Sequence, residues 1–153
     1  MRDNSNHNNT SRGGAANTGY RQNQEIMNTT PRDLPENYID EAEKIMGDLS
    51  RRGVKLTTSK IRNILSRVSD IYNVEVERTA ETLLPESVSS LQMTRVRIAY
   101  ECGRENTVKD FVEESQLLRY IKGVENSRTK FLHFVRYMEA LVAYHRFYGG
   151  KDN

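Results

Sequence analysis

Cysteine is almost absent from this chain of 153 residues, since Cys102 is the only one. An internal disulfide is therefore impossible. A zinc site is excluded as well, because no cysteine or histidine stands at metal-ligand spacing from Cys102. We expect Cys102 to be a buried, inert thiol, and the sequence predicts neither a metal nor any other cofactor.

Long apolar runs are also missing. No stretch approaches the roughly 20 apolar residues that a membrane-spanning helix needs. The N-terminal residues lack the continuous apolar stretch of a signal peptide. We therefore expect a cytoplasmic protein that has no membrane partner.

The first 37 residues lack a periodic apolar face and are rich in Asn, Gly, Ser and Thr. Such a segment cannot bury enough surface to offset the entropy that it would lose on ordering. The sequence therefore predicts a disordered tail over residues 1–37 and a helical bundle domain over residues 38–153. The second part is long enough for one modest hydrophobic core.

Apolar residues in this second part recur at three- and four-residue steps, which indicates helices and leaves no need for a strand. The secondary structure of residues 74–84 is ambiguous from the sequence. We expect Gly103 to end the third helix and Gly149 and Gly150 to end the last. The predicted helices cover residues 38–49, a segment from about 58, residues 86–102, a segment from 106 or 107, and a segment from 130 to the glycine pair. The fold class is all-α, a compact bundle of about five helices.

The last of these helices is apolar nearly all round, so we expect it to be central in the bundle or covered by another subunit. His145 falls within its apolar seam, and we expect a buried histidine whose ring nitrogens are satisfied by hydrogen bonds. The sequence of the segment from Lys130 to Asp152 is KFLHFVRYMEALVAYHRFYGGKD.

This segment resembles the C-terminal signature of the small subunit of the type III-A CRISPR (Csm) effector complex. The matching positions are Phe131, Phe134, Tyr137, Glu139 to His145, Arg146, and Phe147 to Gly150. Two further blocks resemble the same family, LTTSKIRNIL at 56–65 and IAYECGR at 98–104 followed by VKDFV at 108–112. Together they cover roughly Lys55 to Asp152 in the expected order, which is more specific than one motif.

The resemblance implies a non-catalytic subunit of an RNA-guided antiviral complex. Its partners would be guide RNA, target RNA, the backbone and large subunits, and further copies of itself stacked as an inner filament. The paired RNA strands would carry the sequence information, so the protein would hold sugar and phosphate regardless of sequence. RNA and DNA cutting would belong to the neighbouring subunits.

The net charge of +2 says little about nucleic acid, but the charges are unevenly placed. Six basic residues and no acidic ones lie between Arg51 and Ser69. Lys60, Asn63 and Arg67 form a row on one flank of the second helix, and Arg62 falls on the other. Thr57, Thr58 and Ser59 stand where that helix begins, so hydroxyls, free backbone N–H groups and the positive end of the dipole favour a phosphate there. Alternatively, the basic residues keep a surface solvated.

The resemblance favours RNA binding. The first candidates to bind RNA are Lys55, Lys60, Arg62 and Arg67, followed by Arg52, Arg97, Arg104, Arg128 and Lys130.

Two other functions remain open at this stage. RTKFLH, from Arg128 to His133, fits the R-x4-H pattern of metal-independent HEPN ribonucleases, in which an arginine and a histidine from two chains act on RNA. Arg2 to His7 fits the same loose pattern, which weakens the match. The other possibility is a generic helical adaptor that binds nucleic acid. Since His133, Glu139 and His145 fall on different helix faces, they cannot share one metal ion.

Overall fold

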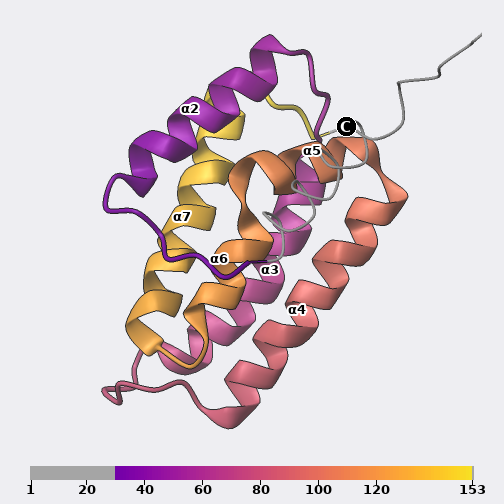
Figure 1. Cartoon of the computed structure of the whole chain (residues 1–153). Coiled ribbons are helices and arrows are strands. Elements are labelled where there is room, and N and C mark those ends of the chain that lie inside the picture. The colour runs from indigo at the N-terminus through magenta and orange to yellow at the C-terminus, as the bar shows by residue number, and fades with distance from the viewer. Residues whose placement is uncertain (1–29, 153) are drawn as a thin grey trace, which may run out of the picture.

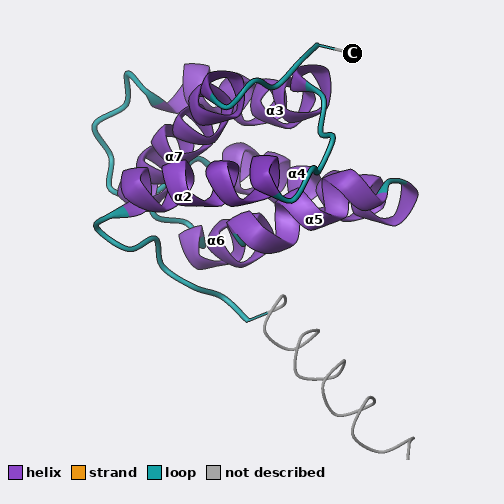
Figure 2. Cartoon of the chain, turned by 90° about the horizontal axis from the view of Figure 1, so that it is seen from above, coloured by secondary structure: helices purple, strands orange, loops and turns teal. Residues whose placement is uncertain are grey.

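The computed structural model describes residues 30–152. These residues form six α-helices packed in one bundle (Figure 1), and no strand occurs among them (Figure 2). The helices are α2 (Tyr38–Arg51), α3 (Thr58–Glu75), α4 (Pro85–Arg104), α5 (Asn106–Ser115), α6 (Leu117–Val124) and α7 (Arg128–Phe147). The all-α bundle predicted from the sequence is confirmed.

Helix α7 is the central element and lies against α2, α3 and α6 (Figure 1). Its seam residues Phe131, Phe134 and Met138 are fully buried, and each such side chain stabilises the fold by about 1.5 to 3 kcal/mol. The buried hydroxyl of Tyr137 donates to the carbonyl oxygen of Ser115, at 2.9 Å. Of the two predicted ways to cover this apolar helix, the structure shows the first, a central place in the bundle.

Helices α3 and α7 run antiparallel, which fixes the two ends of the bundle. Arg128 in the first turn of α7 reaches the last turn of α3, where its guanidinium donates to the carbonyl oxygens of Glu75 (2.8 Å) and Val76 (3.0 Å). At the other end, His145 in the last turn of α7 contacts Leu56, just before α3 begins. We call these the Arg128 end and the His145 end.

The segment predicted as the fourth helix is two helices, because the chain breaks at Gln116. This residue has a φ of 56°, in the left-handed region that separates α5 from α6. The Gln116 side-chain oxygen accepts hydrogen bonds from Arg32 (2.7 Å) and Arg119 (3.0 Å). These bonds hold the break in place. The apolar periodicity continues across residue 116, so the sequence pattern did not reveal it.

Residues 30–37 cross α6 and then α7 before α2 begins, as the indigo segment in Figure 1 shows. The backbone N–H of Arg32 donates to the carbonyl oxygen of Arg119 at 3.1 Å. The carbonyl oxygen of Arg32 lies so close to Gly123 that a Cβ there would approach it to 2.1 Å. The last residues of the predicted tail therefore pack on the bundle, whereas residues 1–29 of that tail lie outside the described part. The boundary after residue 37 stays a prediction.

The prediction that Gly103 ends a helix is wrong. Helix α4 continues to Arg104 and ends at Glu105, whose backbone is extended with a φ of −138°. Gly103 is exposed, and its φ is not among the positive ones. Arg104 in the last turn interacts favourably with the negative end of the helix dipole. The end of α4 therefore does not require a glycine.

The ambiguous segment 74–84 divides at Glu75, the last residue of α3. The Glu75 carboxylate is fully buried and accepts hydrogen bonds from the backbone N–H of Leu84 (2.8 Å) and the guanidinium of Arg78 (2.5 Å). Burial alone would raise the pKa of Glu75. Hydrogen bonds from Ser87, Leu84 and Arg78 outweigh the burial and hold this pKa below its ordinary value. An ionised carboxylate thus anchors the loop that leads to α4.

Candidate nucleic-acid interface

Helix α3 carries the row of Lys60, Asn63 and Arg67, with Arg62 on its other flank. Arg62 is exposed and has no ion-pair partner among the described residues. Lys60 is half-exposed, and its ammonium group pairs with the carboxylate of Glu105, between α4 and α5. Of these two cations of α3, Arg62 is therefore free and Lys60 is neutralised by a neighbouring acid.

Arg67, further along the row, lines an open groove of about 440 Å³ between α3 and α4. The α3 side of the groove also holds Asp70 and Val74, and the α4 side holds Glu86 and the exposed Met93. Within the described residues Arg67 has no ion-pair partner. Because two acids share the groove, its charge is mixed, and Arg67 is the cation that it offers to an anion.

Of the three residues expected to offer donors to phosphate at the start of α3, Thr58 and Ser59 are engaged inside the chain, whereas the Thr57 side chain makes no capping hydrogen bond. The chain's last residues cross the start of α3, and the Thr58 N–H donates to the carbonyl oxygen of Lys151 at 2.9 Å. The Ser59 hydroxyl donates to the carbonyl oxygen of Asp152 at 3.1 Å, and the Thr58 hydroxyl lies 3.4 Å from Nδ1 of His145. These donors are used inside the chain, which the sequence did not reveal because their partners are about 90 residues away.

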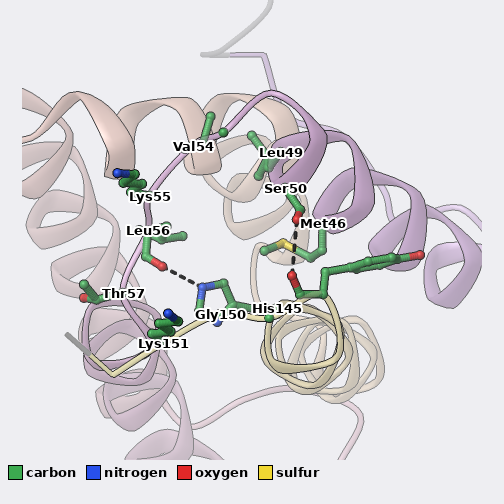
Figure 3. Close-up of a pocket in the computed structure, with 13 residues that line it drawn as sticks. Met46, Leu49, Ser50, Val54, Lys55, Leu56, Thr57, His145, Gly150 and Lys151 are labelled. Carbon is green, nitrogen blue, oxygen red and sulfur yellow. Dashed lines mark hydrogen bonds between the residues drawn. The ribbon is translucent and has the colours of Figure 1, made fainter.

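His145 ties the two chain segments at this end together (Figure 3). Its ring is buried, and Nε2 donates to the carbonyl oxygen of Leu56 at 2.7 Å. Nδ1 lies 3.4 Å from the Thr58 hydroxyl, within reach of a second hydrogen bond. The prediction of a satisfied core histidine is confirmed.

The two glycines after α7 let the chain end fold back over His145. Gly149 has a φ of 88°, where L side chains are strained. A Cβ on Gly150 would come within 2.2 Å of the His145 ring. The Tyr148 ring packs at van der Waals distance over Gly47 of α2, and the Ser50 hydroxyl donates to the Tyr148 carbonyl oxygen at 3.2 Å (Figure 3). We call residues 145–152 the C-terminal latch.

Lys55 lies on the loop between α2 and α3 and is exposed. It lines a cavity of about 390 Å³ at the His145 end, together with Thr57, His145 and Lys151. Lys151 was not among the predicted site residues. No local signal could have found it, because 95 residues separate it from the loop that it joins.

The second group of candidates is scattered and mostly paired. Arg52 bonds to Glu114 at 2.7 Å, Lys130 to Asp33 at 3.0 Å, and Arg104 lies 3.7 Å from Glu101. Arg97 and Arg104 both lie near the exposed ring of Tyr100, at 5.9 and 5.6 Å from its centroid. Lys55, Lys60 and Arg62 lie near the start of α3, at the His145 end. Arg128 and Lys130 lie in the first turn of α7, at the opposite end.

The Arg128 and His133 side chains, which the ribonuclease alternative would use, both have partners within the chain. The Arg128 guanidinium is held on the carbonyls at the end of α3. The His133 ring stacks on Tyr38, with 6.3 Å between centroids.

Among residues 30–152 no group of three or more His, Cys, Asp or Glu side chains could hold a metal ion. Cys102 is half-buried rather than buried as expected, and it is not bonded to another cysteine. Burial raises the pKa of its thiol to about 11, with Glu113 adding to the rise. The thiol is therefore protonated and unreactive at neutral pH. None of the described helices is long and apolar enough to cross a membrane.

The fold and surface together define a small all-α bundle protein that carries free cations on α3 and the loop before it, as well as on α2, α7 and the chain end. Its sequence matches the model of the family described as Csm2 Type III-A over residues 32–151. The chain belongs to that family, which confirms the resemblance seen in the sequence.

Three relatives illustrate the similarity, each described as CRISPR system Cms protein Csm2. The relative from Streptococcus thermophilus is 42% identical over 120 residues, covering 76% of this chain and 95% of its own length. A relative from Mycobacterium tuberculosis is 37% identical over 121 residues, covering 78% of this chain and 97% of its own length. The relative from Enterococcus italicus is 35% identical over 117 residues, covering 72% of this chain and 83% of its own length.

Proposed function

We propose that this chain is a non-catalytic small subunit of a type III-A CRISPR effector complex, where several copies stack along the guide RNA and the target RNA paired with it. Its neighbours are further copies of itself and the backbone and large subunits. Base pairing carries the sequence information, and the protein holds the sugar-phosphate backbone. The observation that carries the proposal is the family match over residues 32–151.

The surface of α3 supports backbone binding. Lys55, Arg62 and Arg67 have no ion-pair partner among the described residues and stand on one helix and its preceding loop. Lys60 is held by Glu105, but a half-exposed ion pair is worth only about 0 to 1 kcal/mol. A phosphate group can therefore take the place of Glu105 at little cost.

The absence of catalysis belongs to the proposal too. The Arg128 guanidinium donates a hydrogen bond to the carbonyl oxygen of Glu75 at the end of α3, and the His133 ring stacks on Tyr38. A cleavage assay with the purified chain and its His133→Ala variant tests this point. Cleavage of RNA by the parent chain that the variant lacks would replace our proposal with a ribonuclease. The cytoplasmic location expected from the sequence stays a prediction.

The main experiment uses the assembled complex with guide and target RNA. Ultraviolet crosslinking followed by peptide mapping should place RNA on α3 and the loop before it. In the purified chain, Arg62→Glu with Arg67→Glu should weaken binding equally for unrelated RNA sequences and reduce the salt slope by about 1.5 to 2. Arg136→Glu is the matched control, because Arg136 is exposed on α7 and unpaired within the described part.

Three results would contradict the proposal. The first is a complex in which no RNA crosslinks to this subunit. The second is a loss of binding for one sequence only, because a backbone contact carries no sequence information. The third is equal binding to plain DNA duplex and to RNA, which would favour the generic adaptor.

A further inference from the structure

The cavity at the His145 end joins two segments that are distant in sequence. One is the loop between α2 and α3, and the other is the C-terminal latch. Figure 3 shows Lys55 and Lys151 on either side of Leu56, one from each segment. Both lysines line the cavity and both are exposed.

These two lysines differ from most others in the described part of the chain. Lys60, Lys109 and Lys130 each have a carboxylate within 4 Å, whereas Lys55 and Lys151 have none. The acid next to Lys151 in sequence, Asp152, is engaged by Arg146 at 3.5 Å. Two uncompensated positive charges at one cavity attract an anion.

Their backbones are held firmly, although the ammonium groups are not. The Lys151 carbonyl accepts from Thr58, and the neighbouring Gly150 N–H donates to the His145 carbonyl oxygen at 2.9 Å. On the other segment, His145 fixes Leu56, the residue after Lys55. Little backbone freedom is therefore lost when a ligand binds, which favours affinity.

We propose that Lys55 and Lys151 form a two-lysine site for consecutive phosphodiester groups of the RNA backbone. The inference rests on the proposed function and adds to it a contact, Lys151, that the basic row does not contain. Thr57 lines the same cavity, and its side chain makes no capping hydrogen bond, so its hydroxyl is a further donor to phosphate. The latch is then the element that brings the second lysine to the RNA.

The first test is lysine acetylation of the assembled complex, measured by mass spectrometry with and without guide and target RNA. Lys55 and Lys151 should become protected when RNA is present. Lys44 is the control, because it is exposed on α2, outside the cavity, and unpaired within residues 30–152. Protection that appears on assembly with the protein subunits alone would assign the lysines to a protein partner and overturn the inference.

The second test compares Lys55→Glu, Lys151→Glu, the double variant and Lys44→Glu in the full chain. Each of the first two should lower affinity for a guide–target RNA duplex by about threefold to tenfold at low salt, and the double variant should reduce the salt slope by about 1.5 to 2. Lys151→Arg should retain binding because it keeps the charge. Reversal of an exposed charge should leave the melting temperature nearly unchanged.

The outcomes separate this inference from the function on which it rests. If the chain binds RNA, the Arg62 and Arg67 double variant binds weakly, and Lys151→Glu binds normally, the two-lysine site is refuted and the function stands. If the parent chain neither binds RNA nor crosslinks to it in the complex, both are refuted.

Discussion

Replacing Gly150 with alanine should break the C-terminal latch. The added Cβ would lie 2.2 Å from Cε1 and 2.3 Å from Nδ1 of His145. Real Cβ atoms do not approach other heavy atoms so closely, so either the ring or the chain end must move. The ring is held by a buried hydrogen bond to the Leu56 carbonyl, and the chain end by the bond from Thr58 to Lys151.

The loss of stability depends on whether the chain end or the His145 ring moves. Overpacking a filled site costs about 1 to 3 kcal/mol. If His145 leaves its position, the Leu56 carbonyl and the imidazole lose their bond in a buried place, which costs a further 1 to 3 kcal/mol, roughly. We therefore expect the Gly150→Ala substitution to reduce the free energy of unfolding by about 1 to 3 kcal/mol if only the chain end moves, and by about 2 to 6 kcal/mol if His145 is displaced.

Urea unfolding of the full chain measures this difference, with Gly103→Ala as the matched control. Gly103 is helical and exposed, and an added Cβ there would meet no other atom within 4 Å. Alanine at this position should stabilise the helix by up to about 1 kcal/mol. The reasoning fails if Gly150→Ala unfolds at the same urea concentration as the parent chain.

Three further predictions concern single side chains. Glu105→Gln should release Lys60 and raise RNA affinity about twofold to fivefold while increasing the salt slope by nearly one; a salt titration that shows unchanged or weaker binding would contradict it. Glu75→Gln should destabilise the chain by about 1 to 3 kcal/mol at neutral pH. Because the folded pKa of Glu75 lies below its unfolded value of 4.5, the carboxylate stabilises the fold above that pH and loses this effect as pH falls through the folded pKa. The difference in urea midpoint should therefore shrink on acidification, and a constant difference would exclude the ionised carboxylate as the cause. Arg128→Ala should cost about 1 to 2 kcal/mol through loss of the carbonyl contacts at the end of α3, more than Lys130→Ala, whose pair with Asp33 is exposed; equal melting temperatures would show that Arg128 does not cap α3.

The fold was largely predictable because apolar periodicity is a local property. The start of α3 at Thr58, the proline at the start of α4 and the buried seam of α7 all follow from residues within a few positions of each other. The break at Gln116 was not predictable, because no residue of the break is a glycine or proline. The side chain at the break is hydrogen-bonded instead to Arg32, a partner 84 positions away.

The candidate site was predictable in composition and not in arrangement. The excess of basic residues between Arg51 and Ser69 is visible in the sequence, and Arg62 lies exposed as expected. Whether a given cation is free depends on its tertiary neighbours, since Glu105 reaches Lys60 and Glu114 reaches Arg52. A helical wheel of the segment that carries the cations shows neither Glu105 nor Glu114.

The C-terminal signature and the cationic surface have different tasks. His145, Gly149 and Gly150 face inward or bend the chain, and they join α7 to the start of α3. None of them presents a charge to a polyanion. Under the proposed function, any effect that they have on RNA binding passes through the lysines that the latch holds in place. A latch variant that still folds should thus weaken RNA binding only while Lys55 and Lys151 are present, and Gly150→Ala combined with the double lysine variant should bind no more weakly than the double variant alone.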